Sequence, residues 1–173
     1  HNFYNVLAAV STALEIGVTS ESIARGIGRI QPVFGRGELI KGDITLLRDC
    51  YNANPDSMEE SLKTLSYWPD RSIAVLGDML ELGAESSKQH DRIGGFAAKS
   101  AAAAIFLVGK EMEAAFESIK VSGFSGYSFW TADFESLKKA LLDYIQKGEL
   151  VLLKGSRGLA LERLRDFSKQ NVV

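Results

Sequence analysis

The sequence predicts an α/β fold in which a mostly parallel sheet carries helices on both faces, preceded by a short helical segment. From residue 72 onward, short and almost wholly apolar runs alternate with longer segments whose apolar residues recur at helical spacing. Strands that are apolar at nearly every position are typical of parallel sheets covered on both sides by helices. With 173 residues, 46% of them hydrophobic, the chain is long enough to bury such a core without disulfides.

The segment before residue 31 predicts two helices. The apolar stripe of the first begins after Asn2, a suitable N-cap, and ends before Gly17, a suitable C-cap. Ser20 is expected to cap a second helix that runs to about Arg29. The stripe of the first helix consists of Phe3, Leu7, Val10 and Leu14.

A change of pattern at residues 31–37 predicts a domain boundary. This stretch, QPVFGRG, contains a proline and two glycines, which interrupt regular structure. We therefore expect residues 1–33 to close one helical domain and residues 34–173 to form another. Within the second, we expect strands at 38–41, 44–50, 72–76, 104–108, 127–130 and 150–153, and helices from residue 55, at 85–100, at 111–119, from residue 134 and at 158–168.

Composition argues against several classes of function. Twenty Lys and Arg against twenty-two Asp and Glu, with no basic block, argue against nucleic-acid binding. The longest apolar run, 101–108, is far shorter than the roughly 20 residues of a membrane span, so no membrane insertion is expected. The single cysteine fits a reducing compartment, and Cys50 is expected to be a small core residue rather than a nucleophile. With two histidines and one cysteine, no His/Cys metal site is expected.

Polar loops follow several of the predicted strands, at the edge where parallel sheets bind their ligands. The segments are 49–57, 77–83, 109–110 and 154–157. None of them is a GxxxxGK[ST] or GxGxxG phosphate loop, and neither pattern occurs elsewhere in the sequence. The sheet is therefore expected to lack a phosphate loop of its own.

The segment that begins with Asp49 is the densest polar cluster. A carboxylate at a strand end can accept hydrogen bonds from ribose hydroxyls, and the amides of Asn52 and Asn54 can both donate and accept. Because Asn, Pro, Asp and Ser are also common in turns and caps, an ordinary strand-to-helix turn stays open as the alternative.

Basic residues mark two further loops. Lys154, Ser156 and Arg157 precede a predicted helix, so they could bind a carboxylate or phosphate together with free backbone amides. The alternative is a glycine turn with solvated charges. Arg36, between two glycines, is either a phosphate clamp or an exposed loop charge.

The sequence leaves the roles of Asp78, Glu81 and His90 open. Asp78 and Glu81, in a loop bounded by glycines, could bind a metal or an ammonium group or could simply be solvated. His90 falls within a predicted helix, where a hydrogen-bonded structural histidine is favoured and a titratable role stays open.

Five motifs in order resemble the Mur ligases, and they span essentially the whole chain. The start of the chain, HNFYNVLAA, resembles the HNxxN-x-LAA segment that closes the family's central ATPase domain. Phe34-Gly35-Arg36 resembles the family's P-G-R hinge, with Phe34 in place of proline. Three further motifs resemble the branch of the family that uses D-alanyl-D-alanine. They are DxYNANPxSM at 49–58, LGDMxELG at 76–83 followed by His90 and Gly94, and KGSR at 154–157.

The resemblance implies a Rossmann-like domain at the end of a three-domain, monomeric, cytoplasmic enzyme of peptidoglycan synthesis. Such an enzyme uses ATP and Mg²⁺ to join D-alanyl-D-alanine to a UDP-muramoyl-tripeptide through an acyl phosphate. By the same resemblance, Asn2, Asn5, Arg36 and Asp49 would contact the nucleotide. The residues that would contact the incoming dipeptide are Asn52, Asn54, Lys154, Ser156 and Arg157.

The family's Walker-type loop, Mg²⁺ ligands and central-domain lysine are expected upstream of His1. The chain by itself is therefore not expected to catalyse ligation, and no catalytic residue or metal ligand is assigned within it. Three alternatives stay open: a sibling ligase that adds an amino acid, a folylpolyglutamate synthase, and a non-catalytic flavodoxin-like binding module. The D-N-P-R signature of the diaminopimelate-adding sibling is absent, since Asn54-Pro55 continues to Asp56.

Overall fold

The computed structural model describes residues 2–31 and 33–164, and the chain divides into two compact units between residues 32 and 33. The first unit holds α1 (Asn2–Glu15) and α2 (Ser20–Ile27). Two details of the helix starts differ from the sequence prediction. Asn2 is the first residue of α1 rather than its cap. Thr19 caps α2 in place of Ser20, which is already helical: the Thr19 side chain accepts a hydrogen bond from the Ser22 amide at 3.4 Å.

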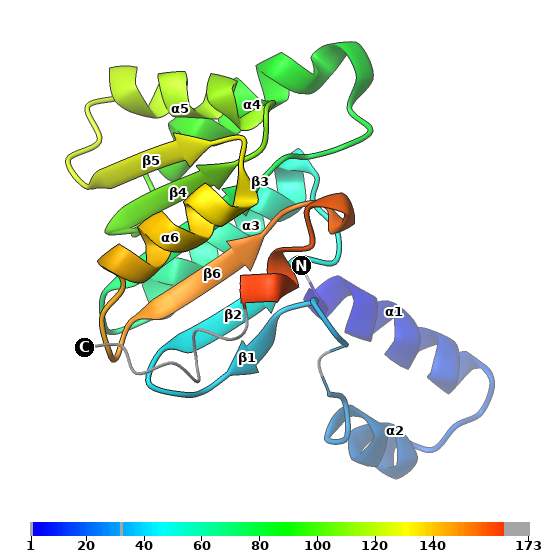
Figure 1. The fold of residues 1–173 in the computed structure, drawn as a ribbon. Coiled ribbons are helices and arrows are strands. Elements are labelled where there is room, and N and C mark those ends of the chain that lie inside the picture. Colours follow the sequence, from blue (N-terminus) through cyan, green and yellow to red (C-terminus); the bar gives the residue numbers. More distant parts are fainter. Residues whose placement is uncertain (1, 32, 165–173) are drawn as a thin grey trace. The chain divides into compact units, whose positions relative to one another are not determined.

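The second unit is built on a mostly parallel sheet, six-stranded over the described residues, in the order β1-β2-β6-β3-β4-β5 (Figure 1). Only β1 and β2 pair antiparallel, and the other four pairings are parallel. The predicted fold class is therefore confirmed. The strands are β1 (Glu38–Ile40), β2 (Thr45–Asp49), β3 (Ser72–Gly77), β4 (Ala104–Val108), β5 (Tyr127–Thr131) and β6 (Leu150–Lys154).

Helices cover both faces of this sheet, as the apolar strands predict. One face carries α3 (Pro55–Thr64), α4 (Ser86–Ala97) and α5 (Met112–Val121), and α6 (Phe134–Tyr144) lies on the other. Successive strand residues alternate between the two cores: Val75 packs on the α6 side, and Leu76 packs on the α3–α5 side. Each such side chain, fully buried, contributes about 1.5–3 kcal/mol.

The predicted helix at 158–168 is wrong over the residues that the structure describes. Arg157 to Leu159 form a single 3₁₀ turn, η3 (Arg157–Leu159), and residues 161–164 form another. Ala160, between them, has left-handed backbone with φ of 48°, which an α-helix cannot accommodate. Leu161 and Leu164, three residues apart, are both fully buried in the core, a spacing that 3₁₀ turns bring to one side. Residues 165–168 lie outside the described part of the chain.

Two further 3₁₀ turns occur in the described part of this unit, η1 (Leu65–Tyr67) after α3 and η2 (Gly83–Glu85) before α4. Within the described residues, every helix is too short or too polar to cross a membrane.

Candidate functional site at the carboxyl edge of the sheet

The carboxyl ends of β2, β6 and β3 meet at one edge of the sheet, because these strands are neighbours and run parallel. In the register, Asp49 at the end of β2 pairs with Lys154 at the end of β6, and Lys154 pairs with Leu76 of β3. The loops that follow the three strands therefore come together. They are three of the four polar segments that the sequence singles out.

Lys154 is a buried cation held by the loop beside it. Its side chain is only 3% exposed, and Nζ lies 2.9 Å from the Asp49 carboxylate. The same ammonium donates a hydrogen bond to the Asn52 carbonyl at 2.9 Å. Asp49 also accepts a hydrogen bond from the Ser61 hydroxyl at 2.6 Å. The sequence analysis assigns Asp49 to the nucleotide and Lys154 to the dipeptide. In the structure these two side chains form an ion pair with each other.

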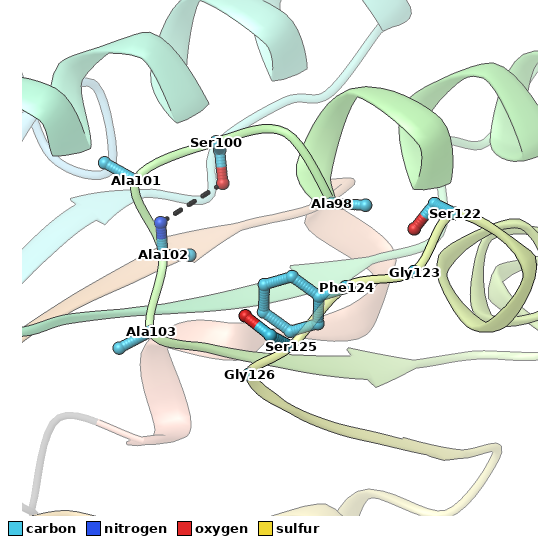
Figure 2. Close-up of a pocket in the computed structure, with 10 residues that line it drawn as sticks. All are labelled: Ala98, Ser100, Ala101, Ala102, Ala103, Ser122, Gly123, Phe124, Ser125 and Gly126. Atoms are coloured by element: carbon cyan, nitrogen blue, oxygen red, sulfur yellow. Dashed lines mark hydrogen bonds between the residues drawn. The ribbon is translucent and has the colours of Figure 1, made fainter.

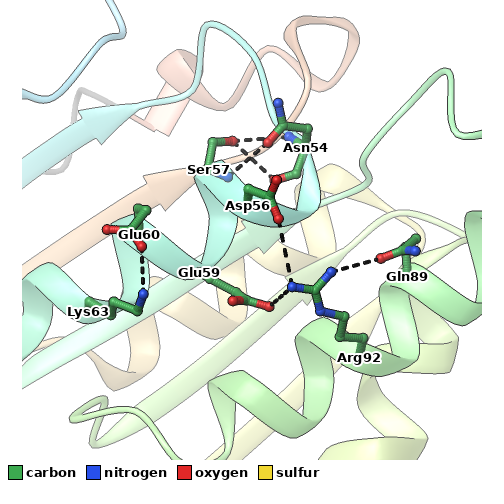
Figure 3. A network of polar contacts seen from close by, with 8 residues as sticks. All are labelled: Asn54, Asp56, Ser57, Glu59, Glu60, Lys63, Gln89 and Arg92. Atoms are coloured by element: carbon green, nitrogen blue, oxygen red, sulfur yellow. Dashed lines mark hydrogen bonds and ion pairs between the residues drawn. The ribbon is translucent and has the colours of Figure 1, made fainter. Parts of the chain in front are cut away.

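The two asparagines of this loop have different tasks. Asn54 is the N-cap of α3: its side chain accepts a hydrogen bond from the Ser57 amide at 2.8 Å, and the Ser57 hydroxyl accepts one from the Asn54 amide at 3.1 Å (Figure 3). This reciprocal capping box, with Pro55 in the first turn, explains why α3 begins there. The Asn52 side chain is exposed, and only its backbone carbonyl is tied down by Lys154.

Ser156 is buried and joins its own turn to the loop after β3. Its amide donates to the Asp78 carbonyl at 3.0 Å, and its hydroxyl accepts a hydrogen bond from the Leu80 amide at 2.9 Å. Two hydrogen bonds in opposite directions therefore fasten the Lys154–Arg157 turn to residues 78–80.

The loop at 77–83 is neither fully solvated nor a metal cluster. Asp78 is buried, and its carboxylate accepts a hydrogen bond from the Met112 amide at 3.0 Å, so it caps the start of α5 from outside that helix. Burial raises the pKa of the Asp78 carboxyl, and the Met112 amide partly offsets this rise. Glu81 is exposed. Over the residues that the structure describes, no three His, Cys, Asp or Glu side chains gather closely enough to hold a metal.

Gly109, after β4, is required by the same carboxylate. A Cβ at this position would lie 2.2 Å from the Asp78 carboxyl group, and its φ of +118° is one that other residues rarely adopt. The glycine that ends the predicted strand therefore makes room for a buried acid.

His90 is a buried, hydrogen-bonded histidine, as the sequence favours. It is fully buried, and its Nε2 accepts a hydrogen bond from the Met79 amide at 2.9 Å. Its Nδ1 lies 2.8 Å from the Ser86 carbonyl, one turn earlier in α4. Both ring nitrogens are therefore engaged within the protein.

Exposed arginines and aromatic rings lie beside the buried ion pair. The Arg36 guanidinium lies 4.4 Å from the centre of the Tyr51 ring, and that of Arg157 lies 5.8 Å from the same ring and 5.3 Å from Phe34. The Tyr51 amide donates to the Gly35 carbonyl at 3.0 Å, which fixes this loop to the end of β2. Arg157 is 54% exposed and lies 3.4 Å from Glu162. Two cations on exposed rings are suited to bind an anion.

Cys50 is a core residue, as the sequence predicts. It is 1% exposed, and its Sγ lies 3.9 Å from the Glu162 carboxylate. Burial, together with the Glu162 charge, raises the pKa of the thiol from 9.0 to about 11. A thiol that is so rarely ionised is a poor nucleophile.

The sequence analysis does not identify three residues that take part in the candidate site, and two of the residues it predicts belong to the first unit. Ser61, which orients Asp49, and the rings of Phe34 and Tyr51, which hold Arg157, are not identified as functional. Of these three residues, only Phe34 has a signal in the sequence, because it replaces the proline of the family's hinge. Asn2 and Asn5 belong to the first unit, and Asn5 is exposed there; their adenine contacts stay predictions.

The geometry above is that of a Rossmann-like ligand-binding domain, and the sequence comparisons specify its family. A profile described as "Mur ligase, glutamate ligase domain" matches residues 35–157, so the chain belongs to the Mur ligase family. It is 39% identical over 171 residues to a UDP-N-acetylmuramoyl-tripeptide–D-alanyl-D-alanine ligase of Treponema pallidum and 34% identical over 176 residues to that of Escherichia coli. These alignments cover 98% and 99% of this chain, which spans 37% of each relative.

Solved structures agree with this assignment. A crystal structure of MurF from Acinetobacter baumannii superimposes with a TM-score of 0.83 at 31% identity, over 98% of this chain and 38% of that protein. MurF of Thermotoga maritima in complex with ADP shares the fold, with a TM-score of 0.67 at 24% identity, over 88% of this chain and 36% of that protein.

Proposed function

We propose that this chain is the C-terminal domain of an ATP-dependent ligase that adds D-alanyl-D-alanine to UDP-N-acetylmuramoyl-tripeptide in peptidoglycan precursor synthesis. Residues 1–33 then close its central ATPase domain, and the whole enzyme acts as a cytoplasmic monomer. The names of its relatives support the reaction. The observation that carries the proposal is the exposed Arg157 on the turn that follows Lys154, which is buried and paired with Asp49.

The dipeptide carboxylate binds Arg157 in this proposal. The Arg157 guanidinium forms two parallel hydrogen bonds to this carboxylate. Lys154 is buried and contributes mainly its positive charge, because two of its three hydrogen-bond donors are already used. The Ser156 hydroxyl and the exposed side chains of Asn52 and Asn54 line the path of the dipeptide. Holding the amine in line with an acyl phosphate is much of the catalysis, since orientation alone accounts for several orders of magnitude in rate.

The nucleotide lies toward the 33–37 loop. Arg36, supported by the Tyr51 ring, binds the ATP phosphates, and Asp49 accepts hydrogen bonds from the ribose. Ser61 and Lys154 both contact the same Asp49 oxygen, Oδ2, so the ribose binds through Oδ1.

The residues of this chain do not fit the Mg²⁺ of the family. The acids at the carboxyl edge, Asp49 and Asp78, are engaged by a lysine and by a helix amide, and no three candidate ligands gather among the described residues. In the proposed enzyme the metal ligands belong to the other domains, as the family resemblance implies.

The test is a pair of matched arginine variants in the full-length enzyme. Arg157→Ala should lower kcat/KM for D-alanyl-D-alanine about thirtyfold, roughly 2 kcal/mol, and change the KM for ATP much less. Arg163 is the control: it is 57% exposed, is paired with Glu135 and lies over the Phe134 ring, so like Arg157 it is an exposed arginine that contacts an acid and an aromatic ring. Arg163→Ala should leave both parameters within about twofold.

Two outcomes would overturn the proposal. Equal losses for ATP and dipeptide in Arg157→Ala would indicate a role in folding or domain closure, and no loss would make the turn a solvated surface feature. Competition between D-alanyl-D-alanine and free amino acids for the same enzyme separates this ligase from its siblings: glutamate, lysine or diaminopimelate as the preferred acceptor would contradict the dipeptide.

A further inference from the structure

We propose that His90 is a positioning residue for the dipeptide site, acting through the backbone of residues 78–80 on Ser156 and Arg157. The inference rests on the proposed function, because it assigns the Lys154–Arg157 turn to the dipeptide. It is carried by a continuous path of hydrogen bonds from a buried histidine on α4 to that turn.

The hydrogen bonds of His90 define its protonation state. The Met79 amide can only donate, so Nε2 must carry a lone pair, and the single ring proton resides on Nδ1, facing the Ser86 carbonyl. The ring is thus held at both ends, by its own helix and by the loop after β3. A histidine in this state acts as a fixed acceptor for one backbone amide.

The helix that carries His90 is a rigid base. Gly94, one turn further along α4, packs directly on α5: a Cβ there would lie 2.2 Å from the Ala115 carbonyl oxygen and 2.7 Å from its Cα. Helices this close cannot slide past each other without steric overlap. The backbone that carries the His90 ring is therefore closely packed against α5.

Met79 lies between the two residues that fasten Ser156. The Asp78 carbonyl accepts from the Ser156 amide at 3.0 Å, and the Leu80 amide donates to the Ser156 hydroxyl at 2.9 Å. Anchoring the Met79 amide therefore fixes both contacts. Arg157 is the next residue along the chain, so the position of its backbone follows from that of Ser156.

This path gives the buried histidine a function that simple packing does not require. A core position could be filled by an apolar side chain, yet Met79 would then have a buried amide without a partner, and the loop would shift to satisfy it. Displacements near 1 Å at a residue that orients a substrate can reduce the rate about a hundredfold.

The test compares two substitutions of similar polarity in the full-length enzyme. In His90→Gln the side-chain oxygen reaches the place of Nε2 and still accepts from Met79, whereas in His90→Asn it reaches only the place of Nδ1. We expect His90→Asn to raise the KM for D-alanyl-D-alanine about tenfold, with the KM for ATP within about twofold of wild type. His90→Gln should recover most of that loss.

Amide hydrogen exchange supplies a readout that does not depend on the reaction. The segment 78–82 should exchange faster in His90→Asn than in wild type, and His90→Gln should restore its protection. The two variants share the loss of the imidazole ring, so a general loss of stability would affect them equally.

The outcomes separate this inference from the proposed function. Equal damage by both variants, or equal rises in the two KM values, would make His90 merely structural and overturn the inference. Unchanged exchange at 78–82 in His90→Asn would overturn it as well. If Arg157→Ala leaves dipeptide use intact, the proposed function fails, whether or not the exchange pattern shows that His90 holds the loop.

Discussion

The two edges of the sheet use buried polar groups in different ways. At the carboxyl edge, Lys154, Asp49 and Ser156 form bonds between loops that follow different strands. At the amino edge the buried acid Glu149 pairs with Arg71 and accepts a hydrogen bond from the Gln146 amide at 2.8 Å, three residues away. The carboxyl edge uses several buried polar groups to join the loops that follow three strands, whereas at the amino edge one buried acid joins the segments before β3 and β6 and closes a turn.

The amino edge also has a hollow of about 310 Å³, shown in Figure 2. Its walls come from the segments before β4 and β5, and within the first of these the Ala102 amide donates a hydrogen bond to the Ser100 hydroxyl at 3.3 Å. The described residues that line it carry no charge; they are Ala98, Ser100, Ala101, Ala102, Ala103, Ser122, Gly123, Phe124, Ser125 and Gly126. The hollow therefore offers no charged side chain to a ligand, whereas the carboxyl edge offers the exposed guanidinium groups of Arg36 and Arg157.

The largest effect on stability should come from breaking the pair at the carboxyl edge. Lys154→Met should lower the free energy of unfolding by about 3–5 kcal/mol, because Asp49 keeps its charge without its cation. Urea denaturation followed by circular dichroism measures this. Adding Asp49→Asn should recover part of the loss, since the double variant leaves no charge unpaired.

A surface pair provides the control for this experiment. Lys63 lies 2.5 Å from Glu60 on α3, with both side chains well exposed, so Lys63→Met should change the free energy of unfolding far less than Lys154→Met does. Similar losses for the two lysines would mean that burial of Lys154 adds nothing, and the contrast between the edges would disappear.

A medium effect is expected at Asp78, the acid that caps α5 from another loop. Asp78→Ala should cost about 1–2 kcal/mol, because the Met112 amide loses its acceptor. Asp78→Asn keeps an acceptor and removes a buried charge, so at pH 7 its stability should equal or exceed that of the wild type. Chemical denaturation of both variants checks this, and a larger loss for Asn than for Ala would contradict it.

The pH dependence follows from the raised pKa of Asp78. The folded state holds this proton more tightly than the unfolded state, whose carboxyl has an ordinary pKa near 3.8. The resulting stabilisation is complete below that pH and is lost as the pH rises through the raised pKa. The stability of wild type relative to Asp78→Asn should therefore fall with increasing pH over this window.

The smallest effect is expected in the hollow at the amino edge. Ser125 is exposed, so Ser125→Ala should change the free energy of unfolding by less than about 0.5 kcal/mol. Thermal unfolding of this variant beside Asp78→Ala compares the two edges directly. A loss above 1 kcal/mol would show that the polar groups of the hollow are more than solvated surface.

The strands are predictable from the sequence because their burial is extreme. All five residues of β4 are buried and apolar, and the same is true of β6 up to Lys154, so these runs allow little else. The start of α3 is equally local, since Asn54, Pro55 and Ser57 form its cap among themselves. The predicted last helix is wrong because Ala160 has left-handed backbone and because Leu161 and Leu164 are buried in the core, which favours two 3₁₀ turns over an α-helix.

In the candidate site, too, some features follow from short segments of sequence and others depend on the tertiary structure. The sequence by itself determined that polar loops follow apolar strands, and that Asp49 and Arg157 lie in such loops, since composition and spacing are properties of short segments. Only the tertiary structure decided that Asp49 binds Lys154 and that Asp78 caps α5. A hydrogen bond or ion pair needs its atoms within about 3–4 Å. That proximity depends on β6 lying between β2 and β3, an order of strands that no local pattern specifies.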